Sequence, residues 1–360
     1  MKILTVIGAR PQFVKAAAVS RKIKEQSTLS EIIVHTGQHY DENMSEVFFR
    51  EMDIPKPNFN LQINNSSHGA MTGKMIEGLE EIMLREKPDT ILIYGDTNST
   101  LAGAIAASKI HIPIAHVEAG LRSFNMRMPE EVNRILADRL SSYLFCPTQQ
   151  AISNLKNEGY DNIPSKIIFS GDVMFDAALY YTDKSKETSK ILSRLNIAAG
   201  EFILTTIHRA ENTDSIENLQ SIFKALRILA KDSTIVLPLH PRTSKFIQNH
   251  QIDTSNIIII EPVGYFDMLQ LIQNAHLVIT DSGGLQKEAY FFQKPCITTR
   301  EQTEWVELVD NGYNILTGAD ADKIIAGYNT MKGKSISLDK NLYGQGNAAE
   351  GIAKFLADVK

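Results

Sequence analysis

The sequence has little cysteine, no long apolar run and no large excess of either charge. Its 360 residues include only two cysteines, Cys146 and Cys296, both in apolar contexts. Such cysteines favour core thiols in a reducing compartment over a disulfide or a metal site. No apolar run approaches membrane-spanning length, and the apolar start at residues 3–7 is too short for a signal-peptide core. We therefore expect a cytoplasmic protein with no membrane association and no metal centre.

The charge balance also excludes some classes of partner. The 37 basic and 42 acidic residues are well mixed and give a formal net charge of -5. This balance offers no reason to expect binding to nucleic acid or to an anionic membrane, so any anion-binding patch must be local. The length and the 43% hydrophobic content allow two domains, each with its own core.

Apolar runs rich in Ile and Val alternate with stretches of helical period, in two series. The first series predicts strands at residues 3–7, 32–36, 90–94, 113–117 and 143–146. The second series predicts strands at residues 202–207, 234–239, 256–260 and 276–280. This alternation is typical of parallel sheets with crossover helices. We predict an α/β protein with two doubly wound, Rossmann-like domains that face a cleft.

The domain boundary is predicted where this rhythm changes. A strand ends at residues 170–172, and a polar run at 182–189 precedes the second series. We therefore assign residues 1–170 to an N-terminal domain and residues 171–346 to a C-terminal domain. A last helix within residues 347–360 follows two glycines that allow the chain to turn back to the first domain.

Three acidic residues follow strands of the first predicted domain. Asp96 follows the strand at 90–94, Glu118 follows the strand at 113–117, and Glu130 lies a short way beyond. Because the carboxyl ends of parallel strands share one edge of a sheet, we expect these carboxylates to converge and to raise one another's pKa values. Such a cluster supplies general acids and bases near neutral pH. Taken alone, Asp96 also fits the N-cap of the next helix.

The first turn lacks the glycine pattern of a dinucleotide site. Residues 8–12 read G-A-R-P-Q, where NAD or FAD binding would need G-x-G-x-x-G. Arg10 at the start of a helix, backed by Lys15, suits a phosphate group instead. A plain surface arginine fits the pattern equally well.

Candidate phosphate ligands follow strands of the second predicted domain. His208 and Arg209 follow the first of these strands, and His240 follows the next, which gives a cationic rim suited to a diphosphate. The strongest motif is T-D-S-G-G-L-Q-K-E at 280–288. Its small residues, Ser282, Gly283 and Gly284, allow backbone N–H groups to approach an anion at the start of a helix. Glu288, one turn further, suits the two hydroxyls of a ribose.

Taken together, the motifs resemble those of the non-hydrolysing UDP-N-acetylglucosamine 2-epimerases. They are G-A-R-P-Q at 8–12, G-D-T at 95–97, H-V-E-A-G-L-R at 116–122, P-E-E-V-N-R at 129–134, H-R-A-E-N at 208–212, T-D-S-G-G-L-Q-K-E-A at 280–289 and Y-G-Q-G at 343–346. The resemblance covers essentially the whole chain and implies the two-domain GT-B fold of glycosyltransferases. Hydrolysing relatives typically have Arg-Ala-Asp at the position of residues 10–12, which favours the non-hydrolysing branch.

The resemblance implies an activity and a set of site residues. The reaction is reversible epimerisation at C2 of UDP-N-acetylglucosamine to UDP-N-acetylmannosamine. UDP leaves by anti elimination to a 2-acetamidoglucal and is then added back. The resemblance implies that Asp96, Glu118, Glu130 and His208 line the sugar. It also implies that Arg10, His208, Ser282, Gly283, Gly284 and Glu288 hold UDP. This chemistry needs a base, an acid and cations, but no cofactor and no metal. Which carboxylate is the base stays open.

Two departures from the usual family motifs bear on substrate and regulation. The family usually has R-P-E where Gln12 stands here, and members with an allosteric site carry Q-H-R-x-M-L-D-Q where residues 38–45 read Q-H-Y-D-E-N-M-S. The second departure argues against allosteric activation. Both variants resemble relatives that act on UDP-2,3-diacetamido-2,3-dideoxy-glucuronate, whose C6 carboxylate Arg127 would pair with. Two alternatives, a GT-B glycosyltransferase and a UDP-sugar-binding regulator without turnover, would use the same UDP motifs. The resemblance to the family also implies that the protein is a homodimer and that it acts in polysaccharide biosynthesis.

Overall fold

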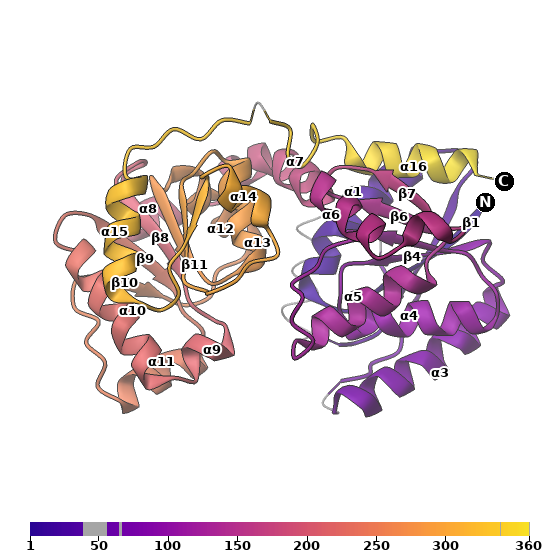
Figure 1. Cartoon of the computed structure of the whole chain (residues 1–360), viewed down its shortest axis with the longest axis horizontal. Helices are drawn as coiled ribbons and strands as arrows, with labels where there is room; N and C mark the ends of the chain where they lie inside the picture. Colours follow the sequence, from indigo (N-terminus) through magenta and orange to yellow (C-terminus); the bar gives the residue numbers. More distant parts are fainter. Residues whose placement is uncertain (39–55, 65–66, 339, 360) are drawn as a thin grey trace. The chain divides into compact units, whose positions relative to one another are not determined.

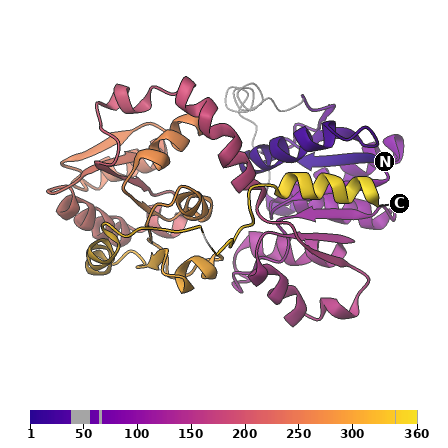
Figure 2. The same ribbon diagram turned by 90° about the horizontal axis from the view of Figure 1, so that it is seen from above.

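The computed structural model describes residues 1–38, 56–64, 67–338 and 340–359. They form two compact units, the first made of Met1–Leu179 with Asn341–Lys360 and the second of Tyr180–Lys340. The boundary predicted after residue 170 falls inside the first unit. Figures 1 and 2 show that the C-terminal helix α16 (Ala348–Asp358) lies among the elements of the first unit.

The first unit is built on a seven-stranded parallel sheet with the order β3-β2-β1-β4-β5-β6-β7. The strands are β1 (Lys2–Ile7), β2 (Ser30–His35), β3 (Phe59–Asn60), β4 (Thr90–Tyr94), β5 (Ile114–Val117), β6 (Tyr143–Cys146) and β7 (Lys166–Phe169). The direction of winding changes between β1 and β4. Doubly wound sheets bind ligands at the carboxyl ends of the two strands that flank such a point.

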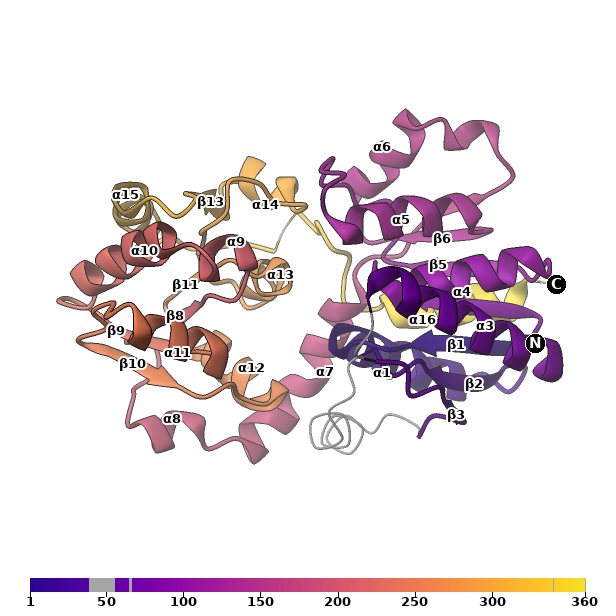
Figure 3. The same cartoon turned by 90° about the horizontal axis from the view of Figure 1, so that it is seen from below.

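Helices cover both faces of this sheet. One face packs against α3 (His68–Glu86), α4 (Asn98–Lys109) and α5 (Pro129–Leu140), which Figure 3 shows in front of the strands. The other face carries α1 (Arg10–Lys24) and α16. Phe355 of α16 packs edge-on against Tyr143 and Phe145 of β6, at ring-centroid distances of 5.3 and 5.4 Å. Helix α6 (Gln149–Asn157) follows β6, and α7 (Val173–Thr188) leads into the second unit.

The second unit repeats this plan with a six-stranded parallel sheet of order β10-β9-β8-β11-β12-β13. The strands are β8 (Phe202–Thr206), β9 (Thr234–Pro238), β10 (Ile257–Ile260), β11 (Leu277–Thr280), β12 (Cys296–Thr298) and β13 (Asn314–Leu316). Helices α10 (Ile216–Leu229), α11 (Pro241–Asn249) and α15 (Ala321–Met331) cover one face. Helices α8 (Ile191–Leu195), α12 (Tyr265–Asn274) and α13 (Gly283–Phe291) cover the other. The short helices α9 (Ala210–Thr213) and α14 (Val306–Asp310) complete the unit. The winding changes between β8 and β11.

The predicted α/β class is confirmed. Every strand expected from the sequence is present with ends within two residues of the prediction, and the strand runs are largely buried, as expected for sheets covered on both faces. Strands β3, β12 and β13 were not predicted, because each is only two or three residues long. No helix in the described part of the chain is long and apolar enough to span a lipid bilayer.

Candidate active-site loops of the two units

Asp96 follows β4, at the carboxyl end of a strand that flanks the change of winding in the first sheet. Thr97, not Asp96, caps α4, because its hydroxyl accepts a hydrogen bond from the Thr100 N–H. Asp96 instead forms an ion pair with Arg134 of α5. The side-chain amide of Asn133 donates to the Asp96 carbonyl at 2.9 Å, which fixes the same loop to α5.

The surroundings of Asp96 favour its ionised form. Burial alone would raise the pKa of Asp96, but the charges of Arg134, Lys15 and His116 hold it below its usual value. The expectation that neighbouring acids raise this pKa is therefore wrong, because the neighbouring basic side chains lower it by more than burial raises it. Asp96 is suited to accept a proton or a hydrogen bond rather than to donate a proton.

Glu118 follows β5 and lies next to the Asp96 loop. Its carboxylate forms an ion pair with Lys15 of α1, and the two side chains are only 8% and 10% exposed. A Cβ atom on Gly95 would lie 3.2 Å from the Lys15 Nζ and 3.4 Å from Glu118 Oε2, so this ion pair packs against the turn before Asp96. Glu118 adopts a left-handed backbone with φ of 71°, a conformation that costs a non-glycine residue about 1 to 2 kcal/mol.

Glu130 and Glu131 begin α5 but differ in their environments. Glu131 is fully buried and accepts hydrogen bonds from the N–H groups of Ser123 and Phe124, and it pairs with Arg134 at 2.9 Å. Glu130 is half-buried, and its carboxylate has no hydrogen bond or ion pair with any residue that the structure describes. One helical turn separates it from Arg134, so the two share a face of α5. Glu131 thus anchors the loop, and Glu130 lies on the face of α5 that carries Arg134, the partner of Asp96.

The turn after β1 joins the two strands at the change of winding. Arg10 begins α1. The buried Gln12 accepts hydrogen bonds from the N–H groups of Gly8 and Ala9 at 2.8 and 3.0 Å, and its own amide donates to the carbonyl of Tyr94 at 2.9 Å. Gln12 therefore ties the end of β1 to the end of β4. Residues 39–45, which carry most of the predicted departure from the allosteric motif, lie outside the described residues.

In the second unit, His208 is oriented by Asp281, a buried acid that follows β11. Asp281 accepts hydrogen bonds from the backbone N–H groups of His208 and Arg209 at 3.0 Å, and the His208 Nδ1 lies 3.0 Å from its Oδ1. Burial would raise the pKa of Asp281, but its hydrogen bond with His208 and the charge of that ring keep it below its usual value. Because the carboxylate holds the proton on Nδ1, the Nε2 of His208 is left for a ligand. The His208 side chain is 51% exposed.

The T-D-S-G-G motif forms the start of α13, as the sequence predicts. Ser282 is the N-cap and accepts a hydrogen bond from the Leu285 N–H. A Cβ atom on Gly283 would lie 2.3 Å from Glu304 Oε1, whereas one on Gly284 would have no neighbour nearer than 3.9 Å. Gly283 thus lies against the Glu304 carboxylate, and the helix start at Gly284 is open on the side where an anion would bind. Glu288 is largely buried one turn further on.

The other predicted cations follow neighbouring strands of the same sheet edge. Arg209 follows β8, and its Nε is buried without a hydrogen-bond partner among the described residues. His240 is exposed just after β9. Lys15, predicted beside Arg10 as a phosphate ligand, lies in the first unit and is paired there with Glu118.

Two residues that position the site were missed from the sequence, Arg134 and Asp281. Both stand inside motifs that were recognised, P-E-E-V-N-R and T-D-S-G-G. A usable signal was present for Asp281: β8 and β11 are neighbours, so the residues that follow them meet at the same sheet edge. For Arg134, the signal was its spacing of four residues from Glu130 on a helix.

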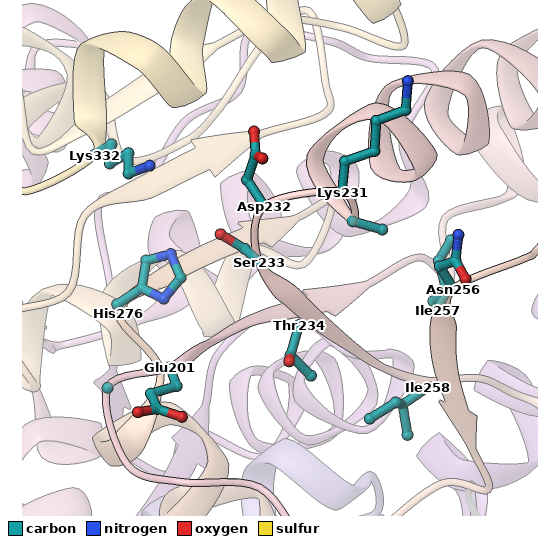
Figure 4. Close-up of a pocket in the computed structure, with 12 residues that line it drawn as sticks. Glu201, Lys231, Asp232, Ser233, Thr234, Asn256, Ile257, Ile258, His276 and Lys332 are labelled. Atoms are coloured by element: carbon teal, nitrogen blue, oxygen red, sulfur yellow. The ribbon is translucent and has the colours of Figure 1, made fainter.

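A cavity of about 870 Å³ lies at the opposite edge of the second sheet, at the amino ends of its strands. Figure 4 shows that acidic and basic side chains both line it, among them Glu201, Asp232, His276 and Lys332. It contains none of the predicted site residues. The mixture of charges gives it no preference for an anion such as UDP.

The comparisons with known proteins agree with this geometry. The family model for UDP-N-acetylglucosamine 2-epimerases matches residues 21–357. A UDP-2,3-diacetamido-2,3-dideoxy-D-glucuronate 2-epimerase from Pseudomonas aeruginosa is 56% identical, with 100% of each chain covered. A UDP-N-acetylglucosamine 2-epimerase homolog from Methanococcus maripaludis is 49% identical, again with 100% of each chain covered.

Solved structures show the same relationship. The crystal structure of Methanocaldococcus jannaschii UDP-GlcNAc 2-epimerase in complex with UDP-GlcNAc and UDP matches with a TM-score of 0.90 at 41% identity, covering 99% of each chain. This similarity confirms the predicted GT-B-like α/β fold. The chain belongs to the UDP-N-acetylglucosamine 2-epimerase family.

Proposed function

We propose that this chain is a non-hydrolysing UDP-sugar 2-epimerase that acts on UDP-2,3-diacetamido-2,3-dideoxy-D-glucuronate. The relative of 56% identity with this activity supports the substrate. The sequence variants at Gln12 and at residues 38–45 also support this substrate, because they resemble those of relatives that act on UDP-2,3-diacetamido-2,3-dideoxy-glucuronate. UDP-N-acetylglucosamine is the second candidate, favoured by the relatives from Methanococcus maripaludis and Methanocaldococcus jannaschii.

The proposed chemistry is proton removal at C2 coupled to departure of UDP from C1. The C2–H bond and the C1–O bond to UDP break together and leave a 2-acetamidoglucal. Protonation at C2 from the other face and return of UDP to C1 complete the inversion. The reaction needs a base and an acid at the sugar and donors at the diphosphate. The observation that carries the proposal is the set of Asp96, Glu118 and Glu130 on neighbouring loops and one helix start of the first unit.

The second unit supplies the groups proposed to hold UDP. The N–H groups of Gly283 and Gly284, the hydroxyl of Ser282 and the Nε2 of His208 act on the diphosphate, and Glu288 binds the ribose hydroxyls. His208 also stabilises the charge that develops on the departing UDP. Arg209 and His240 of the same unit, and Arg10 and Lys15 of the first unit, complete the proposed contacts. Arg127, which is exposed and has no acidic partner among the described residues, is proposed to pair with the C6 carboxylate of the sugar.

One experiment tests this proposal. The enzyme is incubated in deuterated water with each of the two UDP sugars, and product configuration and deuterium at C2 are followed by NMR. We expect incorporation at C2 and a manno-configured product, fastest with the diacetamido-glucuronate. Sugar transfer to an acceptor without isomerisation would instead identify a glycosyltransferase, and UDP binding without turnover would identify a regulator. A homodimer and a cytoplasmic location belong to the same proposal, and light scattering tests the dimer.

A further inference from the structure

His116 of β5 lies at the centre of a buried polar network in the first unit. Its side chain is 0% exposed. The ring Nε2 lies 2.7 Å from the Gly95 carbonyl oxygen, and the Nδ1 lies 2.7 Å from Oδ1 of Asp138 on α5. Both ring nitrogens therefore have an oxygen partner at hydrogen-bond distance.

Both partners of the ring are acceptors. A backbone carbonyl has no proton to donate. The second oxygen of Asp138 already accepts hydrogen bonds from the Gly120 N–H at 3.1 Å and from the guanidinium of Arg122 at 2.7 Å. Burial alone would raise the pKa of Asp138, but the hydrogen bonds and charges of His116 and Arg122 hold it below its usual value, so it is ionised. The His116 ring therefore lies between two acceptors, the Gly95 carbonyl and the Asp138 carboxylate.

The network extends to a second carboxylate through Arg122. Arg122 makes a two-pronged ion pair with Glu158, at 2.6 and 2.7 Å. Its guanidinium thus links two carboxylates, Asp138 and Glu158. The neighbouring thiol of Cys146 has its pKa raised by burial and stays neutral, as does the phenol of Tyr160 for the same reason. A buried charge is tolerated when it is paired and hydrogen-bonded in this way.

The network joins the two loops that carry the proposed acids. Gly95 directly precedes Asp96, and Gly120 lies two residues after Glu118. The His116 ring bonds to the first loop through the Gly95 carbonyl and to the second through Asp138 and the Gly120 N–H. Glu118 lies between these contacts and has a left-handed backbone with φ of 71°. A non-glycine residue keeps this conformation only where surrounding contacts impose it.

We infer that His116 is a positioning residue that holds the Asp96 and Glu118 loops in one fixed arrangement. The inference concerns the reaction proposed above and rests on that proposed function. It assigns to His116 no contact with substrate.

The positioning role is tested by kinetics. The amide introduced by His116→Gln offers a donor to only one of the two acceptors, so we expect kcat to fall about 100-fold, the effect of misplacing catalytic groups by about 1 Å. The UDP dissociation constant should be unchanged, because the proposed UDP ligands lie in other loops. His111→Gln, an exposed histidine on the turn before β5, is the matched control and should keep wild-type kcat.

The outcomes separate the inference from the proposed function. A His116→Gln variant that is less stable but keeps its kcat per folded molecule would show a purely structural role and overturn the positioning role. A wild-type enzyme inactive on both UDP sugars would refute the proposed function, and with it the positioning role.

Discussion

The two sheets share one strand order but use charge differently at their carboxyl edges. In the first unit, the proposed acids are held in ion pairs, Asp96 with Arg134 and Glu118 with Lys15. In the second unit, the buried Asp281 accepts hydrogen bonds from the backbone N–H groups of His208 and Arg209 and orients the His208 imidazole. In the proposed function, the first edge moves protons and the second presents donors to an anion. The same topology therefore supports two kinds of chemistry, and the residues after the strands decide which.

The largest expected effect comes from neutralising the acids of the first edge. Asp96→Asn and Glu118→Gln each keep the side-chain shape but remove a group that exchanges protons. We expect each to lower kcat about 1000-fold, within the usual range for loss of a general acid or base, with the UDP dissociation constant unchanged. Single-turnover assays and calorimetry with UDP provide the measurements. Glu81→Gln, on the exposed surface of α3, is the control, and weaker UDP binding in Asp96→Asn would contradict the division between the edges.

Asp281→Asn is expected to remove the carboxylate that orients His208 at the second edge. The amide no longer holds the proton on Nδ1 of His208, so the ring loses its orientation and its support for charge on UDP. We expect kcat to fall about 100-fold, and we also expect UDP to bind more weakly, as loss of an oriented donor implies. Asp253→Asn, an exposed carboxylate in the same unit, should behave as wild type in both assays. Unchanged UDP affinity in Asp281→Asn would show that His208 does not contribute to binding the diphosphate of UDP.

A buried acid away from both edges is expected to affect stability alone. Asp176 accepts hydrogen bonds from the N–H groups of Ala348 and Ala349 at the start of α16, yet burial raises its pKa to about 6. A carboxyl group whose pKa is raised on folding stabilises the protein fully when the pH is below the pKa that the group has in the unfolded chain. This contribution is lost as the pH rises through the folded-state pKa of about 6. The expected loss between pH 4 and pH 7 is about 2 kcal/mol. Urea unfolding should show this slope in the wild type and a smaller one in Asp176→Asn. Equal slopes would contradict the raised pKa.

The smallest expected effect concerns which sugar the first edge prefers. If Arg127 pairs with a C6 carboxylate, Arg127→Ala should lower kcat/KM for the diacetamido-glucuronate about fivefold, the effect of an exposed ion pair of about 1 kcal/mol. The value for UDP-N-acetylglucosamine should not change. Arg139→Ala, an exposed arginine on α5, controls for the general loss of positive charge. Equal losses with both sugars would remove Arg127 from substrate selection.

The sequence was sufficient to place loops but not to pair charges. Asp96 and Glu118 were located because strand ends in a parallel sheet share an edge, which needs only the strand pattern. Their cationic partners come from helices distant in sequence, so the lowered pKa of Asp96 was not predicted. The distinct environments of Glu130 and Glu131 likewise depend on the path of the loop at residues 121–128. Strands of three residues, such as β12, carry too few side chains for a periodic pattern.

The return of the chain to the first unit sets an order for folding during synthesis. Residues 180–340 form the second unit, and they are translated before α16. Until α16 emerges from the ribosome, Tyr143 and Phe145 lack the ring of Phe355 that covers them. The second unit is therefore an insertion that can finish folding first, and the unit translated first completes its core last. Nascent chains stalled before residue 348 should hold an apolar sheet face exposed, which makes them the species in greatest need of a chaperone.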